Sequence, residues 1–190
     1  MRGTAGIIAL ASAVLVGALV VVFVQFQDGP NRTGVVRVGG AAKAEASCTD
    51  RSPRCLPKIT MMDLAGREWR PEDLAGKVVV ANVWATWCKP CAQEIPDLEA
   101  IHRAYEKKGV VLLGLLNDNV GDAALDAFVE RMHISYPVIR MDDGLYAAFD
   151  EPDRLPTTFV YDKSGHLHFG DKGVMTEERL GAMLDKLLAE

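Results

Sequence analysis

The 190-residue sequence lacks an excess of positive charge, with 21 lysines and arginines against 26 aspartates and glutamates and a net charge of −5. This mild acidity argues against nucleic acid as a partner, because binding to phosphates depends on a basic surface. Histidine is also scarce, with four residues. His166 and His168 alternate onto one side of an expected strand, which we interpret as a solvated face rather than a metal site. We expect no cofactor, and the sequence shows no internal repeat.

Charged side chains are absent from Ala5 to Val24, a stretch of twenty residues. As a helix this stretch would span roughly 30 Å, enough to cross the hydrocarbon layer of a lipid bilayer. A secretory signal peptide has a shorter apolar region, of about 7–15 residues, with a small-residue cleavage site just after it. The small-residue patterns at 42–46 lie well past the apolar stretch. We therefore predict that residues 1–26 form an uncleaved membrane anchor, a single N-terminal transmembrane helix.

Cysteine is rare, and its four residues form two close pairs, Cys48 with Cys55 and Cys88 with Cys91. Paired cysteines in one small domain fit an oxidising compartment. Basic residues lie on both sides of the apolar stretch, so their distribution does not orient it. The cysteines lead us to place the domain outside the cytoplasmic membrane.

Glycine and proline are frequent in residues 27–57, which we interpret as a flexible tether that contains Cys48 and Cys55. Residues 58–190 have the pattern and length of one compact domain. We expect strands at 59–62, 68–69, 78–84, 110–116, 137–140, 157–161 and 166–169, and helices at 91–108, 122–132, 145–149 and 177–188. This alternation predicts an α/β fold with a central mixed sheet flanked by helices on both faces.

The most specific motif is the run from Trp87 to Cys91 (WCKPC), which closes an apolar strand and opens a helix. Two thiols two residues apart can interconvert between dithiol and disulfide without a large backbone movement. A helix N-terminus lowers the pKa of the first thiol, so Cys88 can be a thiolate nucleophile near neutral pH. A structural zinc site uses the same spacing and would need two more ligands, which Cys48 and Cys55 could supply.

A strand before this motif, a helix after it and a later Leu155-Pro156 before another strand together resemble the thioredoxin superfamily. The segment Asn82–Cys88 (NVWATWC), followed by Cys91, Glu94 and Pro96, is similar to the membrane-anchored TlpA/ResA/CcmG branch. The resemblance covers roughly residues 58–190. It implies a thioredoxin-like fold in a single-pass protein of the bacterial cytoplasmic (inner) membrane, with the C-terminal domain on the periplasmic side.

The same resemblance assigns roles to individual residues. Cys88 would attack a target disulfide, and Cys91 would resolve the mixed disulfide and leave Cys88–Cys91 oxidised. Pro156 resembles the cis-proline of the superfamily, which would let the Leu155 backbone pair with an incoming peptide; the alternative is an ordinary trans proline. Trp87 would be a further substrate contact.

Glu94 follows Cys91 by three residues, so their side chains share one face of the expected helix. If that face is covered, the carboxyl pKa rises and Glu94 could exchange a proton with the Cys91 thiol; the ResA-like branch has a functional glutamate at this position. The alternative is an exposed glutamate that only favours the helix dipole. Asn82 occupies a strand position where thioredoxins have a buried aspartate.

We expect Trp84 and Trp87 to frame the active-site surface, with Trp84 mostly packing. A purely structural role for both tryptophans is equally open.

Three interpretations remain open for Cys48 and Cys55. They could form a structural disulfide, an auxiliary redox pair that passes electrons to Cys88–Cys91, or free or intermolecular thiols.

The resemblance implies a membrane-tethered thiol–disulfide oxidoreductase that reduces protein disulfides outside the cytoplasm. Its implied substrates are apocytochrome c or copper-assembly proteins, and its implied electron donor is a membrane protein of the DsbD or CcdA type. A thiol peroxidase and a Sco-like copper chaperone are alternatives on the same fold. Asn82 occupies the place where the peroxidase motif has proline, Thr86 is one residue too close to Cys88, and the copper chaperone uses C-x-x-x-C.

Overall fold

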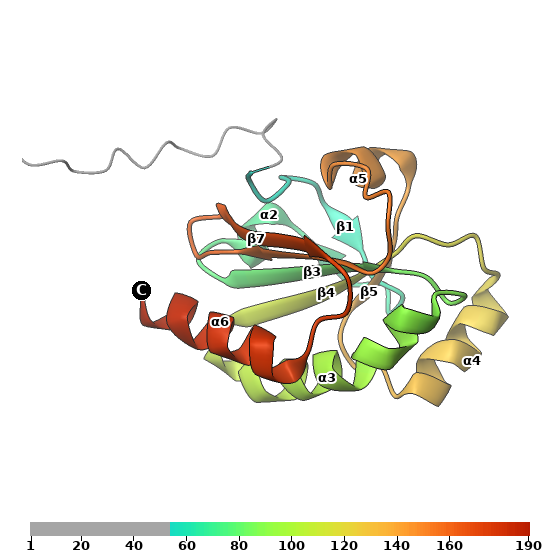
Figure 1. Ribbon diagram of the computed structural model, residues 1–190. Coiled ribbons are helices and arrows are strands. Elements are labelled where there is room, and N and C mark those ends of the chain that lie inside the picture. Colours follow the sequence, from blue (N-terminus) through green and yellow to red (C-terminus); the bar gives the residue numbers. More distant parts are fainter. Residues whose placement is uncertain (1–53) are drawn as a thin grey trace, which may run out of the picture. The chain divides into compact units, whose positions relative to one another are not determined.

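A central β-sheet organises residues 54–190, the part of the chain that the computed structural model describes (Figure 1). The strands are Met61–Met62 (β1), Glu68–Trp69 (β2), Val78–Trp84 (β3), Val110–Leu116 (β4), Val138–Arg140 (β5), Thr157–Tyr161 (β6) and Leu167–Lys172 (β7). The last five form one sheet in the order β5-β4-β3-β6-β7. β3, β4 and β5 are parallel, whereas β6 is antiparallel to both β3 and β7. The predicted mixed sheet is confirmed.

Helices cover both faces of this sheet. They are Pro71–Leu74 (α2), Lys89–Tyr105 (α3), Asp122–Met132 (α4), Asp143–Ala148 (α5) and Glu177–Ala189 (α6), and the 3-10 turn Glu106–Lys108 extends α3. Figure 1 shows α3 and α6 below the sheet, with α2, α5 and the β1–β2 hairpin above it. Leu125 and Phe128 of α4 belong to the same core as α3 and α6. The predicted flanking helices are therefore present on both faces.

Strand β3 is buried over its whole length, as its nearly continuous apolar sequence predicts. Its side chains alternate between two cores. Val78, Val80 and Trp84 face α3 and α6, whereas Val79, Ala81 and Val83 face α5 and the hairpin. This double burial fixes the position of the loop that leaves β3 for α3.

Several element boundaries follow from local signals in the sequence. β3, β4, β6 and α4 have the predicted bounds. α3 begins at Lys89, two residues before the predicted start, because Cys88 caps the helix and Pro90 stands in its first turn. Thr176 caps α6 as expected, with its side chain accepting a hydrogen bond from the Arg179 backbone N–H. The short α2 was not expected from the sequence.

The predicted anchor, Cys48 and most of the predicted tether lie outside the described residues. Within residues 54–190, no helix is long and apolar enough to cross a membrane. The end of the predicted tether is paired with the domain: the Leu56 N–H donates to the Gly165 carbonyl at 2.8 Å, and the Leu167 N–H donates to the Arg54 carbonyl at 2.6 Å. Residues 54–56 therefore extend the β7 edge of the sheet.

Gly114 in the middle of β4 allows two aromatic rings to approach the sheet. A Cβ atom at this position would lie 2.8 Å from Cε2 of Tyr136 and 2.9 Å from Nε1 of Trp84. Both rings are buried and cannot turn away freely. The absence of a side chain here lets Trp84 stack on Phe128, with ring centroids 5.4 Å apart.

We predict that Gly114→Ala lowers the free energy of unfolding by about 1–3 kcal/mol, because the added methyl group overpacks the core between Trp84 and Tyr136. Urea unfolding measures the change. Gly144→Ala is the matched control, since a Cβ there meets only Asp142 Oδ1, at 3.4 Å, and the residue is helical. The control is expected to be neutral or slightly stabilising. Equal stability of Gly114→Ala and the parent protein would contradict the prediction.

Candidate functional site

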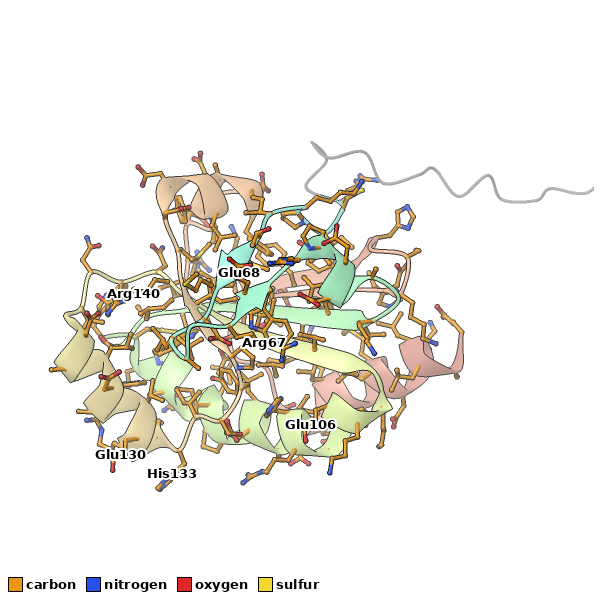
Figure 2. All side chains as sticks on the ribbon, turned by 180° about the vertical axis from the view of Figure 1, so that it is seen from behind. Arg67, Glu68, Glu106, Glu130, His133 and Arg140 are labelled. Atoms are coloured by element: carbon orange, nitrogen blue, oxygen red, sulfur yellow. A yellow bond between two sulfur atoms is a disulfide. The ribbon has the colours of Figure 1, made fainter. Side chains whose placement is uncertain are left out.

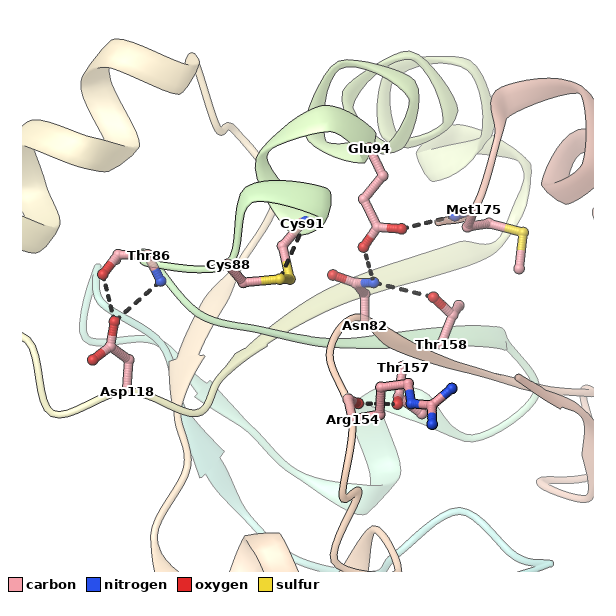
Figure 3. Close-up of a disulfide and its surroundings, with 10 residues drawn as sticks. All are labelled: Asn82, Thr86, Cys88, Cys91, Glu94, Asp118, Arg154, Thr157, Thr158 and Met175. Atoms are coloured by element: carbon pink, nitrogen blue, oxygen red, sulfur yellow. Dashed lines mark hydrogen bonds between the residues drawn. A yellow bond between two sulfur atoms is a disulfide. The ribbon is translucent and has the colours of Figure 1, made fainter. Parts of the chain in front are cut away.

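A disulfide joins Cys88 and Cys91 at the N-terminus of α3 (Figure 3). The two Cα atoms are 5.2 Å apart. The Cys88 side chain is 4% exposed, whereas Cys91 is completely buried. Cys91 is therefore the more buried of the two cysteines, as predicted, and Cys88 is the more accessible one.

The start of α3 surrounds Cys88 Sγ with positive potential. The Cys91 backbone N–H donates to Cys88 Sγ at 3.2 Å, and Cys88 is the N-cap residue of the helix. In the reduced protein the same N–H and the helix dipole would stabilise a Cys88 thiolate. This stabilisation does not require a cationic side chain.

A carboxylate from the connection after β4 holds the loop before Cys88. The Thr86 backbone N–H donates to Asp118 Oδ2 at 3.1 Å, and the Thr86 hydroxyl donates to the same oxygen (Figure 3). The Asn117 N–H donates to the Trp84 carbonyl at 2.9 Å. The sequence analysis did not identify Asp118 as a site residue. The one signal for it was its position just after β4, because β3 and β4 are adjacent parallel strands that end at the same edge of the sheet.

Glu94 lies one turn after Cys91 and is completely buried. Its Oε1 accepts a hydrogen bond from Asn82 Nδ2 at 2.7 Å, and its Oε2 accepts one from the Met175 backbone N–H at 2.8 Å (Figure 3). The alternative of an exposed glutamate that only favours the helix dipole is wrong. The covered face of α3 that the hypothesis required is present.

Burial raises the pKa of the Glu94 carboxyl to about 7. Loss of hydration is the largest cause; the hydrogen bonds from Met175 and Asn82 oppose it, and the charge of Asp97 adds to it. A carboxyl with this pKa can be protonated or ionised near neutral pH. Glu94 therefore has the acid strength that a proton exchange with a nearby thiol requires.

Asn82 connects Glu94 to the strand that follows the proline. Its Nδ2 also donates to Thr158 Oγ1 at 3.0 Å, and Asn82 and Thr158 are partners in the β3–β6 register. Thr158 and Met175 are site residues that the sequence analysis missed, because neither belongs to a short motif around the cysteines.

The Leu155–Pro156 peptide bond is cis, so the trans alternative is wrong. Pro156 is buried and Leu155 half-buried. The Gly173 N–H donates to the Pro156 carbonyl at 2.8 Å, and Val83 pairs with Thr157. The cis bond therefore lies at the end of β3 from which the loop to Cys88 leaves.

Exposed apolar side chains lie on either side of this region. Trp87, directly before Cys88, is 70% exposed. Val174 is 40% exposed, and its neighbours Gly173 and Met175 bond to Pro156 and Glu94. Exposed apolar groups beside a reactive disulfide are typical of a surface that binds another polypeptide. Trp84 is completely buried and stacks on Phe128, which confirms its expected packing role; of the two tryptophans, only Trp87 belongs to this exposed surface.

The second cysteine pair lies partly outside the described residues. Cys55 is buried and disulfide-bonded, and it pairs with His166 beside the turn before β7; its expected partner, Cys48, is not described. The strand register puts Cys55 near Tyr161 and Leu167, at the Val79 end of β3. That end is roughly 17 Å along β3 from Trp84, and exchange needs contact between sulfur atoms. Cys55 Sγ is therefore too far from Cys88 for direct exchange in one folded domain.

Comparisons with known proteins agree with this geometry. A family profile described as the AhpC/TSA family matches residues 54–169. The chain is 38% identical to the thiol-disulfide oxidoreductase ResA of Geobacillus thermodenitrificans over 135 residues, 69% of this chain and 75% of that protein. It is 30% identical to the thioredoxin-like protein YneN of Bacillus subtilis over 130 residues, 68% of this chain and 76% of that protein. A thioredoxin-family thiol:disulfide interchange protein from Chlorobium tepidum TLS superposes with a TM-score of 0.66 at 26% identity, over 74% of this chain and 99% of that one.

We predict that Glu94 makes the free energy of unfolding depend on pH. The Glu94 pKa is about 7 in the folded protein and about 4.5 in the unfolded chain, so the unfolded chain loses this proton first as pH rises. The contribution of Glu94 is fully present below pH 4.5 and falls by up to about 3 kcal/mol as pH rises through 7.

Urea unfolding of the oxidised protein and of Glu94→Gln across this pH range tests the prediction. The stability difference between the two proteins should change with pH in favour of Glu94→Gln as pH rises. Parallel pH profiles would show that Glu94 is not the titrating group.

Proposed function

Since the chain belongs to the AhpC/TSA family and is a homologue of the ResA thiol-disulfide oxidoreductases, we propose that it reduces protein disulfides outside the cytoplasm. The single observation that carries the proposal is the exchange-competent Cys88–Cys91 pair with a fully buried carboxyl, Glu94, one turn behind it. A buried carboxyl three residues after the resolving cysteine, on the same face of α3, would give the reduced site a proton acceptor that solvent does not reach.

The proposed reaction has two exchange steps. The Cys88 thiolate attacks one sulfur of the target disulfide, the target S–S bond breaks, and the released target thiolate takes a proton. Cys91 then passes its proton to Glu94 and attacks Cys88 Sγ, which breaks the mixed disulfide and releases the second target cysteine as a thiolate, and this thiolate takes a proton from solvent. Two electrons move to the target, and the Cys88–Cys91 bond forms.

The surface around Cys88 supplies the docking site in this proposal. The Leu155 backbone, held by the cis bond to Pro156, pairs with an extended target segment, and Trp87 contacts its side chains. Trp87, Leu155 and Pro156 are the proposed substrate contacts.

Tethering to the membrane completes the proposal. Residues 1–26 would cross the bacterial cytoplasmic membrane once, and the domain predicted at residues 58–190 would lie on the periplasmic side. The predicted tether of residues 27–57 would end before Arg54, because residues 54–56 pair with the sheet. Confinement near the bilayer raises the effective concentration of membrane-bound partners. A membrane thiol reductant of the DsbD or CcdA type would return the pair to the dithiol, and apocytochrome c or copper-assembly proteins would be the targets.

The geometry does not favour a thiol peroxidase. A peroxidatic cysteine needs a threonine hydroxyl near its sulfur, but the Thr86 hydroxyl donates to Asp118 and points away from Cys88 (Figure 3). Consumption of peroxide by the purified protein would reverse this assignment. Stoichiometric copper binding by Cys88 and Cys91 would support the copper-chaperone alternative.

We predict a reduction potential for Cys88–Cys91 well below about −200 mV, as a reductase requires, whereas a value near −120 mV would make the protein an oxidant. Equilibration of the full chain with defined glutathione and dithiothreitol ratios, read by alkylation and mass spectrometry of each cysteine, measures the potential. The same experiment reports whether Cys55 stays oxidised throughout.

We predict that Cys91→Ser traps mixed disulfides between Cys88 and target proteins, because the resolving thiol is removed after the first exchange step. Non-reducing electrophoresis of the membrane fraction, followed by mass spectrometry, identifies the trapped proteins. Cys88→Ser/Cys91→Ser is the matched control and should trap none. Trapped proteins that are all cytoplasmic would contradict the proposed location.

A further inference from the structure

A hollow of about 500 Å³ opens beside the reactive disulfide, lined by Trp87, by the connection after β4 and by the start of α5. We refer to it as the Trp87 hollow. Trp87 both lines the hollow and directly precedes Cys88. Any polypeptide that places a sulfur atom against Cys88 therefore has neighbouring side chains within reach of it.

The charge of the Trp87 hollow has one sign. Asp118, Asp142 and Asp143 line it, and no lysine or arginine does. Two of these carboxylates have structural tasks, since Asp118 holds Thr86 and Asp142 Oδ1 accepts a hydrogen bond from the Leu145 N–H at 2.7 Å. The Asp143 side chain is exposed and makes no hydrogen bond or ion pair with another residue of the described range 54–190. The hollow thus offers uncompensated negative charge.

Aromatic rings complete the lining. Trp87 is 70% exposed, the most exposed of the large apolar side chains in residues 54–190, and Tyr146 lines the hollow as well. The face of an indole ring attracts lysine and arginine side chains, and the effect is strongest for tryptophan. A cation over Trp87 would have carboxylates beside it, and the stem of the side chain would cover apolar ring surface.

We propose that the Trp87 hollow binds a lysine or arginine of the target polypeptide that lies within a few residues of the target cysteine. This inference rests on the proposed function, because it takes a polypeptide docked at Cys88 as its premise. The contact selects basic target segments and speeds their encounter with the negatively charged surface. Asp142, Asp143 and Trp87 determine this preference.

The test uses the reduced full chain and three synthetic peptides that differ only in the residue before a single cysteine, which is lysine, glutamine or glutamate. Each peptide cysteine carries 2-nitro-5-thiobenzoate as a mixed disulfide. Attack of Cys88 on the peptide sulfur forms the enzyme–peptide disulfide and releases the coloured thiolate, whose absorbance gives the rate. We expect the lysine peptide to react about fivefold or more faster than the glutamate peptide at low salt, with glutamine between them, and the ratio to shrink as salt rises.

The variant Asp142→Asn/Asp143→Asn removes the charge while asparagine preserves the cap of α5. The matched control is Asp126→Asn/Glu130→Gln, which removes two charges from the exposed surface of α4, where Figure 2 labels Glu130. Neither residue lines the Trp87 hollow. We expect the lysine-to-glutamate rate ratio to fall at least about twofold in the first variant and to stay at the parent value in the control. The rate with the glutamine peptide should change little in either.

A lysine-to-glutamate rate ratio near one in the parent protein overturns the inference. An equal fall of this ratio in both variants also overturns it, because the net charge of the whole protein, and not the Trp87 hollow, would then cause the preference. Both of these outcomes leave the proposed function standing, because the glutamine peptide still reacts. Failure of the reduced protein to attack any of the three peptides would instead overturn the proposed function and the inference together.

Discussion

The arrangement of the site depends on the burial of β3 between a parallel and an antiparallel neighbour. Its register pairs Asn82 with Gly114 on one side and with Thr158 on the other. The parallel partner directs the loop that supplies Asp118 to the end of β3 where Cys88 lies, and the antiparallel partner brings Pro156 to the same end. A slip of one residue would turn every side chain of β3 to the opposite face and separate Asn82 from Glu94.

Helix α3 buries two carboxylates, Glu94 and Glu99, and neither forms an ion pair with a lysine or arginine of residues 54–190; hydrogen bonds compensate them to different degrees. Glu99 accepts hydrogen bonds from the Ser135 N–H, from the Ser135 hydroxyl at 2.8 Å and from the Tyr136 N–H at 3.3 Å, which ties the connection before β5 to the helix. Glu94 has two donors and a raised pKa. Two donors only partly replace the lost hydration, so Glu94 can change its protonation state with little cost near neutral pH.

Much of this domain could be predicted from its sequence because the decisive signals are local. Apolar runs give the bounds of β3 and β4, and the helix start places Cys88 at a cap. The partners of Glu94 could not be found in this way, since Met175 contributes a backbone N–H from a residue 81 positions away. The role of Asp118 and the lining of the Trp87 hollow could not be predicted either. They involve segments far apart in the sequence that the order of the strands in the sheet brings together.

The strand order also places the N-terminal segment of the domain and the reactive disulfide at opposite ends of the sheet. Arg54 to Leu56 pair with the turn region before β7, at the Val79 end of the sheet, whereas the reactive disulfide lies beyond Trp84 at the other end. A support, a label or a fused protein joined on the N-terminal side of Arg54 is therefore attached at the end of the domain away from Cys88. The domain is suited to oriented immobilisation, with its disulfide presented outward for capture of partner thiols.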